Sequence, residues 1–173
     1  MLRAVCYLVA LWPCLALPGA SLTPDEVLGR IAKLGAAPTL DAMYEDGGEW
    51  RQVLSGIASG DRHWLRVAVE LHPTSDAGPS RQLELATGEA LEHHPGAVLE
   101  IAVPVIGIRS VCSGPDVDDK RYDSFELSTK AIERRKRMLR GVSGSGLVAV
   151  RNRCIQQLEA SKAGIAKFYG VQR

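Results

Sequence analysis

The sequence lacks the compact motifs that identify most enzymes from their residues alone. A glycine-rich run at residues 141–146 has no Lys-Ser or Lys-Thr pair after it, as a nucleotide-binding P-loop requires. The same run misses the nucleophile elbow of serine hydrolases, because Ser145 stands where the second glycine of Gly-x-Ser-x-Gly belongs. None of the four histidines lies in the His-Glu-x-x-His pattern of zinc hydrolases. We therefore interpret the run as a connection between helices and predict no catalytic residue, no metal site and no cofactor.

Long apolar segments are also lacking, with one exception at the N-terminus. Residues 1–20 combine a basic start, an apolar stretch at residues 4–17 and small residues before position 21, the three parts of a secretory signal. Its apolar stretch of 14 residues, broken by Pro13 and followed by Pro18, is shorter than the roughly 20 that a membrane-spanning helix needs. We predict a cleaved signal peptide at residues 1–20, a single helical domain at residues 21–173, no stable membrane span, and a periplasmic or secreted protein.

Cysteine is scarce, and half of it lies in the predicted signal. Cys6 and Cys14 would be removed with the signal, so Cys112 and Cys154 remain. Two cysteines in an oxidising compartment suggest one disulfide. In the chain-entropy model, a bridge between residues 42 apart stabilises the fold by about 4 kcal/mol. The alternative is a pair of buried free thiols.

Short amphipathic helices dominate what is present. Residues 23–26 place a capping threonine, a proline at the first helical position and a glutamate three residues after the cap, which predicts a helix to about residue 34. Apolar residues at intervals of three and four predict a helix at residues 48–59, and the same pattern predicts another at residues 62–71. Gly60 ends the first of these, and so short a break makes an antiparallel hairpin.

A second helical pair is expected at residues 80–93 and 95–103. Residues recur between the two pairs at an offset of 30: Arg51-Gln52 with Arg81-Gln82, and His63 with His93. Stacked short hairpins of this kind resemble the HEAT-like helical families over residues 46–103. A solenoid needs three or more repeat units, so the resemblance implies that the rest of the chain covers the exposed ends of the stack.

Residues 98–111 are rich in β-branched side chains and are the main candidate for a strand. Pro104 divides the segment, however, and its only candidate partner strand is at residues 147–150. We predict a buried helix, a break at Pro104 and an irregular apolar stretch, followed by long helices at residues 124–140 and 147–168. The predicted fold class is all-α: about six or seven helices in short antiparallel hairpins, as a HEAT-like stack or an irregular bundle with one disulfide.

Charge is divided unevenly along the chain. Residues 21–108 hold 6 Lys and Arg against 13 Asp and Glu, whereas residues 109–173 hold 14 against 7. The division indicates either two halves that neutralise each other or a basic surface for an acidic partner. The candidate partner-binding residues are Arg134, Arg135, Lys136, Arg137 and Arg140. Because aromatics are absent among them and export is predicted, we exclude nucleic acid and keep three alternatives: a solvated helix face, an acidic protein, or an anionic envelope surface.

Histidine offers a second candidate site. His63 and His93 would approach each other if the two hairpins stack, although histidines at the surface or at helix ends are the simpler interpretation. Trp50 and Trp64 both lie within apolar stripes, which favours core packing over exposure in a binding groove.

These patterns favour an exported, non-catalytic binding or scaffold protein of the cell envelope. We expect its partner to be a protein that binds in the groove between the two central hairpins. A secreted hydrolase with a His/carboxylate site, such as His63 with Glu70 or Asp61, is one alternative. An inhibitor or immunity-type protein that neutralises a secreted enzyme is the other.

Overall fold

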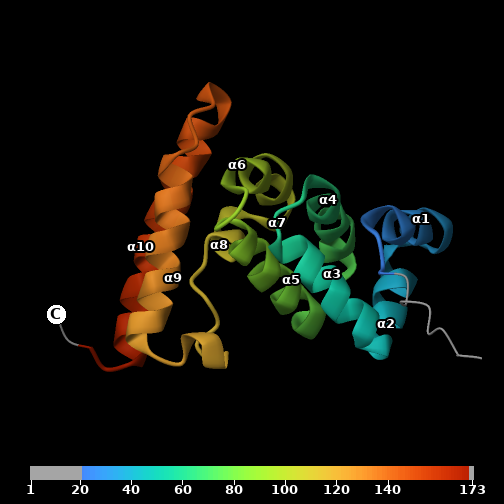
Figure 1. Ribbon diagram of the computed structural model, residues 1–173, viewed down its shortest axis with the longest axis horizontal. Helices are drawn as coiled ribbons and strands as arrows, with labels where there is room; N and C mark the ends of the chain where they lie inside the picture. Colours follow the sequence, from blue (N-terminus) through green and yellow to red (C-terminus); the bar gives the residue numbers. More distant parts are fainter. Residues whose placement is uncertain (1–20, 172–173) are drawn as a thin grey trace, which may run out of the picture.

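The computed structural model describes residues 21–171, which form helices joined by short turns (Figure 1). In chain order these are α1 (Pro24–Leu34), α2 (Ala36–Asp46), α3 (Gly48–Ala58), α4 (Arg62–Leu71), α5 (Ala77–Ala90), α6 (Pro95–Ala97), α7 (Val103–Ile106), α8 (Ile108–Val111), α9 (Phe125–Arg140) and α10 (Val148–Phe168). No strand occurs within the described range, which confirms the all-α fold class. The predicted signal at residues 1–20 lies outside the described residues.

Helices α1 and α2 form one end of the molecule (Figure 1). The predicted capping box opens α1: the Thr23 hydroxyl accepts from the Glu26 amide, and the Glu26 carboxylate accepts from the Thr23 amide at 2.8 Å. Gly35, at φ 91°, ends α1 and lets the chain turn directly into α2. α2 therefore begins at Ala36, the residue that directly follows this glycine.

The central hairpin consists of α3 and α4, which pack closely against each other. Asp61 caps α4, and its carboxylate accepts from the amides of His63 and Trp64 at 2.9 and 3.1 Å. The Trp64 ring covers Gly56, where an added Cβ would lie only 2.4 Å from the ring. Glycine at this position therefore permits the close approach of the two helices.

The chain stays helical through residues 98–106, so the predicted break at Pro104 is wrong. A π-helical turn at Val98–Ala102 precedes α7, and the Val103 amide donates to the Val98 carbonyl five residues back. Pro104 then falls in the first turn of α7, a position that tolerates proline. The chain instead turns at Gly107, which has φ 95°.

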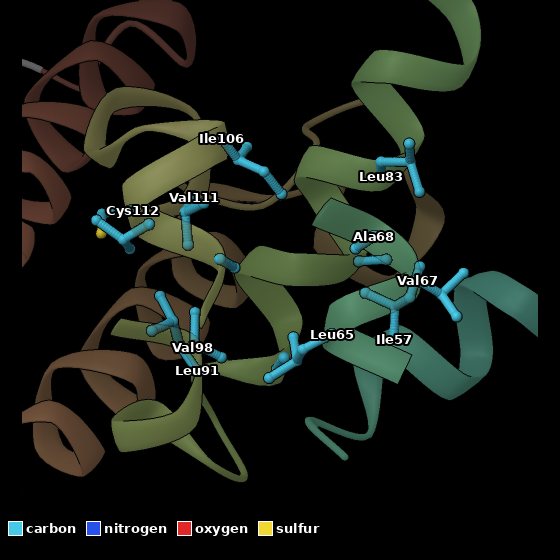
Figure 2. Close-up of a cluster of buried hydrophobic side chains, with 14 of the residues drawn as sticks. Ile57, Leu65, Val67, Ala68, Leu83, Leu91, Val98, Ile106, Val111 and Cys112 are labelled. Carbon is cyan, nitrogen blue, oxygen red and sulfur yellow. The ribbon is translucent and has the colours of Figure 1, made fainter. Parts of the chain in front are cut away.

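The hydrophobic core runs along the joined helices (Figure 2). Its fully buried side chains include Ile57, Leu65, Leu71, Leu83, Leu91, Val98 and Val111. Each such side chain contributes about 1.5–3 kcal/mol to folding. Trp50 is 4% exposed and donates its indole N–H to Gln82 on α5, which confirms that it packs in the core. The core thus ties α3 and α4 to α5 and the segments that follow.

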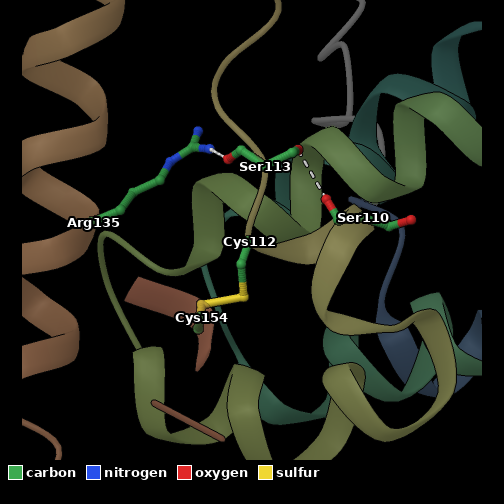
Figure 3. The surroundings of a disulfide bond; sticks show 5 residues. All are labelled: Ser110, Cys112, Ser113, Arg135 and Cys154. Carbon is green, nitrogen blue, oxygen red and sulfur yellow. Dashed lines mark hydrogen bonds between the residues drawn. A yellow bond between two sulfur atoms is a disulfide. The ribbon is translucent and has the colours of Figure 1, made fainter. Parts of the chain in front are cut away.

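The α9–α10 hairpin forms the opposite end of the molecule from α1 and α2 (Figure 1). Cys112 at the end of α8 and Cys154 in α10 form the predicted disulfide, with both cysteines fully buried (Figure 3). α10 packs on α9 and α8. The bridge therefore attaches the hairpin covalently to the central stack. No helix of residues 21–171 combines the length and the apolar character needed to cross a bilayer.

Removing this bridge should destabilise the protein. We expect the Cys112→Ala/Cys154→Ala variant to lose about 4 kcal/mol of unfolding free energy, because its unfolded chain is no longer closed into a loop. Urea denaturation followed by circular dichroism measures the change. Dithiothreitol should lower the midpoint of the wild type and leave that of the variant unchanged. An equal response of the two proteins to dithiothreitol would contradict the prediction.

Candidate functional site

The acidic and basic halves of the chain meet at a buried arginine. Arg135 on α9 is 1% exposed; its Nε donates to Glu92 at 3.3 Å, and its Nη1 donates to the Ser113 carbonyl at 3.0 Å (Figure 3). Arg134 donates to the same Glu92 carboxylate at 2.7 Å. One carboxylate just beyond the end of α5 therefore holds two adjacent arginines of α9.

The space for the Arg135 guanidinium comes from a glycine. A Cβ at Gly88 would lie 3.3 Å from Nη1 of Arg135 and 3.1 Å from the Val111 carbonyl. Burial lowers the pKa of Arg135, and the negative charge of Glu92 opposes this effect. Since a guanidinium stays protonated across the physiological range, Glu92 has to neutralise a buried positive charge.

A second contact between the halves forms at Arg121, in the 3₁₀ turn Lys120–Tyr122. Its Nη2 donates to Glu89 on α5 and to Asp119, both at 2.7 Å. The hydrogen bonds that Arg121 donates to Asp119 and Glu89 raise the pKa of Arg121, and the Arg121 guanidinium lowers the pKa of Asp119. Together with the Glu92 pairs, this cluster shows that the two halves neutralise each other in part.

The predicted partner-binding run divides in the structure. Arg134 and Arg135 bind Glu92, and Lys136, which is 5% exposed, binds Glu133 and Glu159. Arg137 and Arg140 are exposed and have no carboxylate partner within residues 21–171. Three of the five side chains are therefore held by intramolecular ion pairs, and two remain available at the surface.

Two further arginines join Arg137 and Arg140 at the closed end of the α9–α10 hairpin. Arg151 and Arg153 lie in the first two turns of α10, and Arg151 donates to the Val142 carbonyl at 2.7 Å. We call these four residues the arginine tip. Arg151 and Arg153 lie outside the predicted basic run, because the glycine-rich turn at residues 141–146 separates them from it. One signal was available: no Asp or Glu occurs between Glu133 and Glu159.

The predicted histidine pair is placed differently from the stacked arrangement. His63 lies with its Nδ1 3.4 Å from the Asp25 carboxylate of α1, and its side chain is half exposed. His94, rather than His93, packs beside Gly60 at the end of the α3–α4 hairpin. Within residues 21–171, no hydrogen bond joins His63 to His93, and no three His, Cys, Asp or Glu side chains are grouped to hold a metal.

His72 is the histidine with the most suggestive neighbours. The Ser80 hydroxyl and the Glu84 carboxylate lie 3.4 and 3.5 Å from it, but both approach the same ring atom, Nε2. In a Ser-His-acid triad the serine and the acid occupy opposite ring nitrogens, so that one side orients the ring while the other accepts the proton. This geometry does not form that relay.

A hollow lies between one helix of each of the two predicted hairpins, and we call it the groove. It lies between α3 and α5, with a volume of about 450 Å³. Its lining includes the apolar side chains Leu54, Ala58, Leu85 and Ala86, the polar side chains Ser55 and Gln82, and the Arg121, Glu89 and Asp119 cluster. The groove therefore combines an apolar floor with a charged edge, to which α5 contributes Glu89 and the C-terminal half of the chain contributes Asp119 and Arg121.

Comparisons with protein families, with curated proteins and with solved structures found no match to this chain.

The Glu92 contact should be essential to stability. We expect Glu92→Ala to cost about 3 kcal/mol of unfolding free energy, because Arg135 keeps its charge and loses its buried counter-ion. The matched control is Glu126→Ala, which removes a carboxylate from the exposed pair with Lys130 and should cost less than about 1 kcal/mol. Urea denaturation of both variants makes the comparison. Similar losses in the two variants would show that Arg135 does not depend on Glu92.

Proposed function

We propose that this chain is an exported, non-catalytic binding or scaffold protein of the cell envelope. The observation that carries the proposal is the groove between α3 and α5, with its apolar floor and charged edge. In protein interfaces, apolar side chains anchor in desolvated pockets, and surrounding polar groups fix the register. We infer that the groove binds a segment of a partner protein.

The charged side chains at the edge of the groove are better placed to bind a partner than to catalyse a reaction. The Arg121 guanidinium is held by Glu89 on one side and Asp119 on the other. The Tyr122 ring lies 5.2 Å from its central carbon, which further restricts its movement. A guanidinium held in this way is preorganised, so a partner does not have to order it on binding. The resemblance of residues 46–103 to HEAT-like families supports the same interpretation, because stacked hairpins form extended binding surfaces.

Two observations support export. Residues 1–20 have the pattern of a secretory signal, and the Cys112–Cys154 disulfide is of a kind that persists in oxidising compartments. The alternative of a secreted hydrolase receives no support from His72, whose neighbours share one ring nitrogen. An inhibitor or immunity-type protein remains compatible with the groove, and identification of the partner distinguishes it from a scaffold.

Export can be measured directly. We expect the full chain, expressed in a bacterial host, to be recovered from the periplasmic fraction with Ser21 as its first residue, because the signal is removed there. Mass spectrometry without reduction should give a mass two hydrogen atoms below that of the reduced chain. Recovery of the unprocessed chain from the cytoplasm would argue against export.

Partner binding can be assigned to the groove by photo-crosslinking. A photoreactive amino acid at position 85 should give a discrete adduct in intact cells, because Leu85 lines the groove. The matched control is position 127, where Leu127 is 40% exposed on α9. Leu54→Arg, on the facing wall, should remove the adduct at position 85 if the protein remains folded by circular dichroism. Equal adducts at positions 85 and 127, or none at position 85, would count against the groove.

A further inference from the structure

The closed end of the α9–α10 hairpin carries positive charge that the described chain does not neutralise. Residues 134–158 contain seven Lys and Arg and no Asp or Glu. Three of these cations are bound by carboxylates from other segments: Arg134, Arg135 and Lys136. The four residues of the arginine tip have no such partner within residues 21–171. The tip therefore carries four positive charges without a carboxylate partner, three on exposed side chains and one on the half-buried Arg151.

The electrostatics of the helices account for only half of the tip. Arg137 and Arg140 lie in the last turn of α9, where the helix dipole favours cations. Arg151 lies in the first turn of α10, where the dipole disfavours a cation and no acidic residue is present, and Arg153 lies in the next turn. Arg151 donates to the Val142 carbonyl and to the Asn152 side chain, but these neutral acceptors do not cancel its charge, and an anion outside the chain is the natural counter-charge.

The shape of the tip favours a broad surface as its partner. The closed end of the hairpin projects past α6 (Figure 1), and the connecting residues 143–146 are exposed. The arginines point in more than one direction around this end: Arg137 lies beside Glu133 and Arg134 on α9, whereas Arg153 faces α7 and α8. A projecting end with arginines on several sides can contact a flat surface more readily than it can enter a pocket of a partner protein.

Apolar side chains accompany the charges. Met138 is 39% exposed, and the lining of a shallow hollow of about 630 Å³ beside Arg153 includes Val103, Pro104, Ile108, Leu147 and Val150, together with Glu100, whose carboxylate is paired with Arg62. At a bilayer surface, apolar side chains enter the headgroup layer while guanidinium groups bind phosphate. An acidic protein would supply the negative charge but would need a concave surface to reach all four arginines.

We propose that the arginine tip docks on the surface of an anionic phospholipid bilayer. The docking uses the lipid phosphates as counter-ions for Arg137, Arg140, Arg151 and Arg153. It is independent of the groove between α3 and α5, so the protein can hold a partner while it lies on a membrane.

The test is co-sedimentation of the full chain with vesicles made of equal parts phosphatidylglycerol and phosphatidylcholine. Each arginine near an anionic surface strengthens binding about fivefold at low salt. We expect the variant with all four tip arginines changed to Gln to bind at least about a hundredfold more weakly, and Arg153→Gln alone to bind about fivefold more weakly. Pure phosphatidylcholine vesicles should bind neither protein tightly.

A matched control holds net charge constant. It changes four exposed cations of the acidic half to Gln: Lys33, Arg51, Arg66 and Arg81. Its net charge equals that of the tip variant, and all variants retain residues 1–20, so a difference between them reports the position of the charges. We expect the control to bind phosphatidylglycerol vesicles within about fivefold of wild type, the contribution of one arginine.

Several outcomes would overturn the proposal. The wild type could bind phosphatidylcholine vesicles as tightly as phosphatidylglycerol vesicles, or the tip variant could bind as tightly as the wild type. The control could lose as much affinity as the tip variant, or the tip could retain an acidic protein while the chain binds no vesicles. If the tip variant fails to fold, the test uses Arg153→Gln and a salt titration of the wild type. Vesicle binding that does not weaken as salt is added excludes docking by the tip. Leu54→Arg should bind vesicles normally, which separates a failure here from a failure of the groove.

Discussion

The buried contact between Arg135 and Glu92 sets the position of the whole C-terminal hairpin. A guanidinium removed from water requires a counter-ion and further acceptors. Glu92, just beyond the end of α5, is the counter-ion and the Ser113 carbonyl is an acceptor, whereas the buried Nη2 has no hydrogen-bond partner among the described residues. Ser113, which accepts from Arg135, directly follows Cys112. Arg135 and the disulfide therefore both hold the short segment at residues 112–113. The charged side chain of Arg135 ties α9 to this segment and the sulfur of Cys154 ties α10 to it, so neither helix can shift along the stack without disturbing the other.

This constraint also determines which charges face outward. Glu89 and Glu92 lie within the acidic half, yet their partners Arg121, Arg134 and Arg135 all come from the basic half. With these partners paired, and with Lys136 held by Glu133 and Glu159, the surplus of positive charge moves to the end of the hairpin. The groove and the arginine tip are thus two results of one arrangement. The C-terminal half supplies Asp119 and Arg121 to the charged edge of the groove, and the arginine tip consists of cations of that half that no carboxylate of the described residues binds.

Local signals made much of the fold predictable. The capping box of α1 and the apolar periodicity of α3 and α4 depend only on residues that are near one another in the chain. The disulfide could be predicted from the number of cysteines and the expected oxidising compartment. The π-helical turn before Pro104 could not be predicted, because it depends on packing of residues 98–102 against α4. The burial of Arg135 and the exposure of Arg137 could not be predicted either. Neighbours in a basic run look alike in sequence, and only the approach of Glu92, 43 residues earlier, distinguishes them.

The disulfide has a mechanical consequence. Cys112 and Cys154 close residues 112–154 into a covalent ring that contains all of α9 and the arginine tip. Tension applied between the two ends of the chain passes through the sulfur–sulfur bond and bypasses the ring. The contour length of those 41 intervening residues is unavailable to stretching while the bond is intact. A pull on the arginine tip would instead enter the ring, where α9 and the first turns of α10 would share the load up to the disulfide at their base.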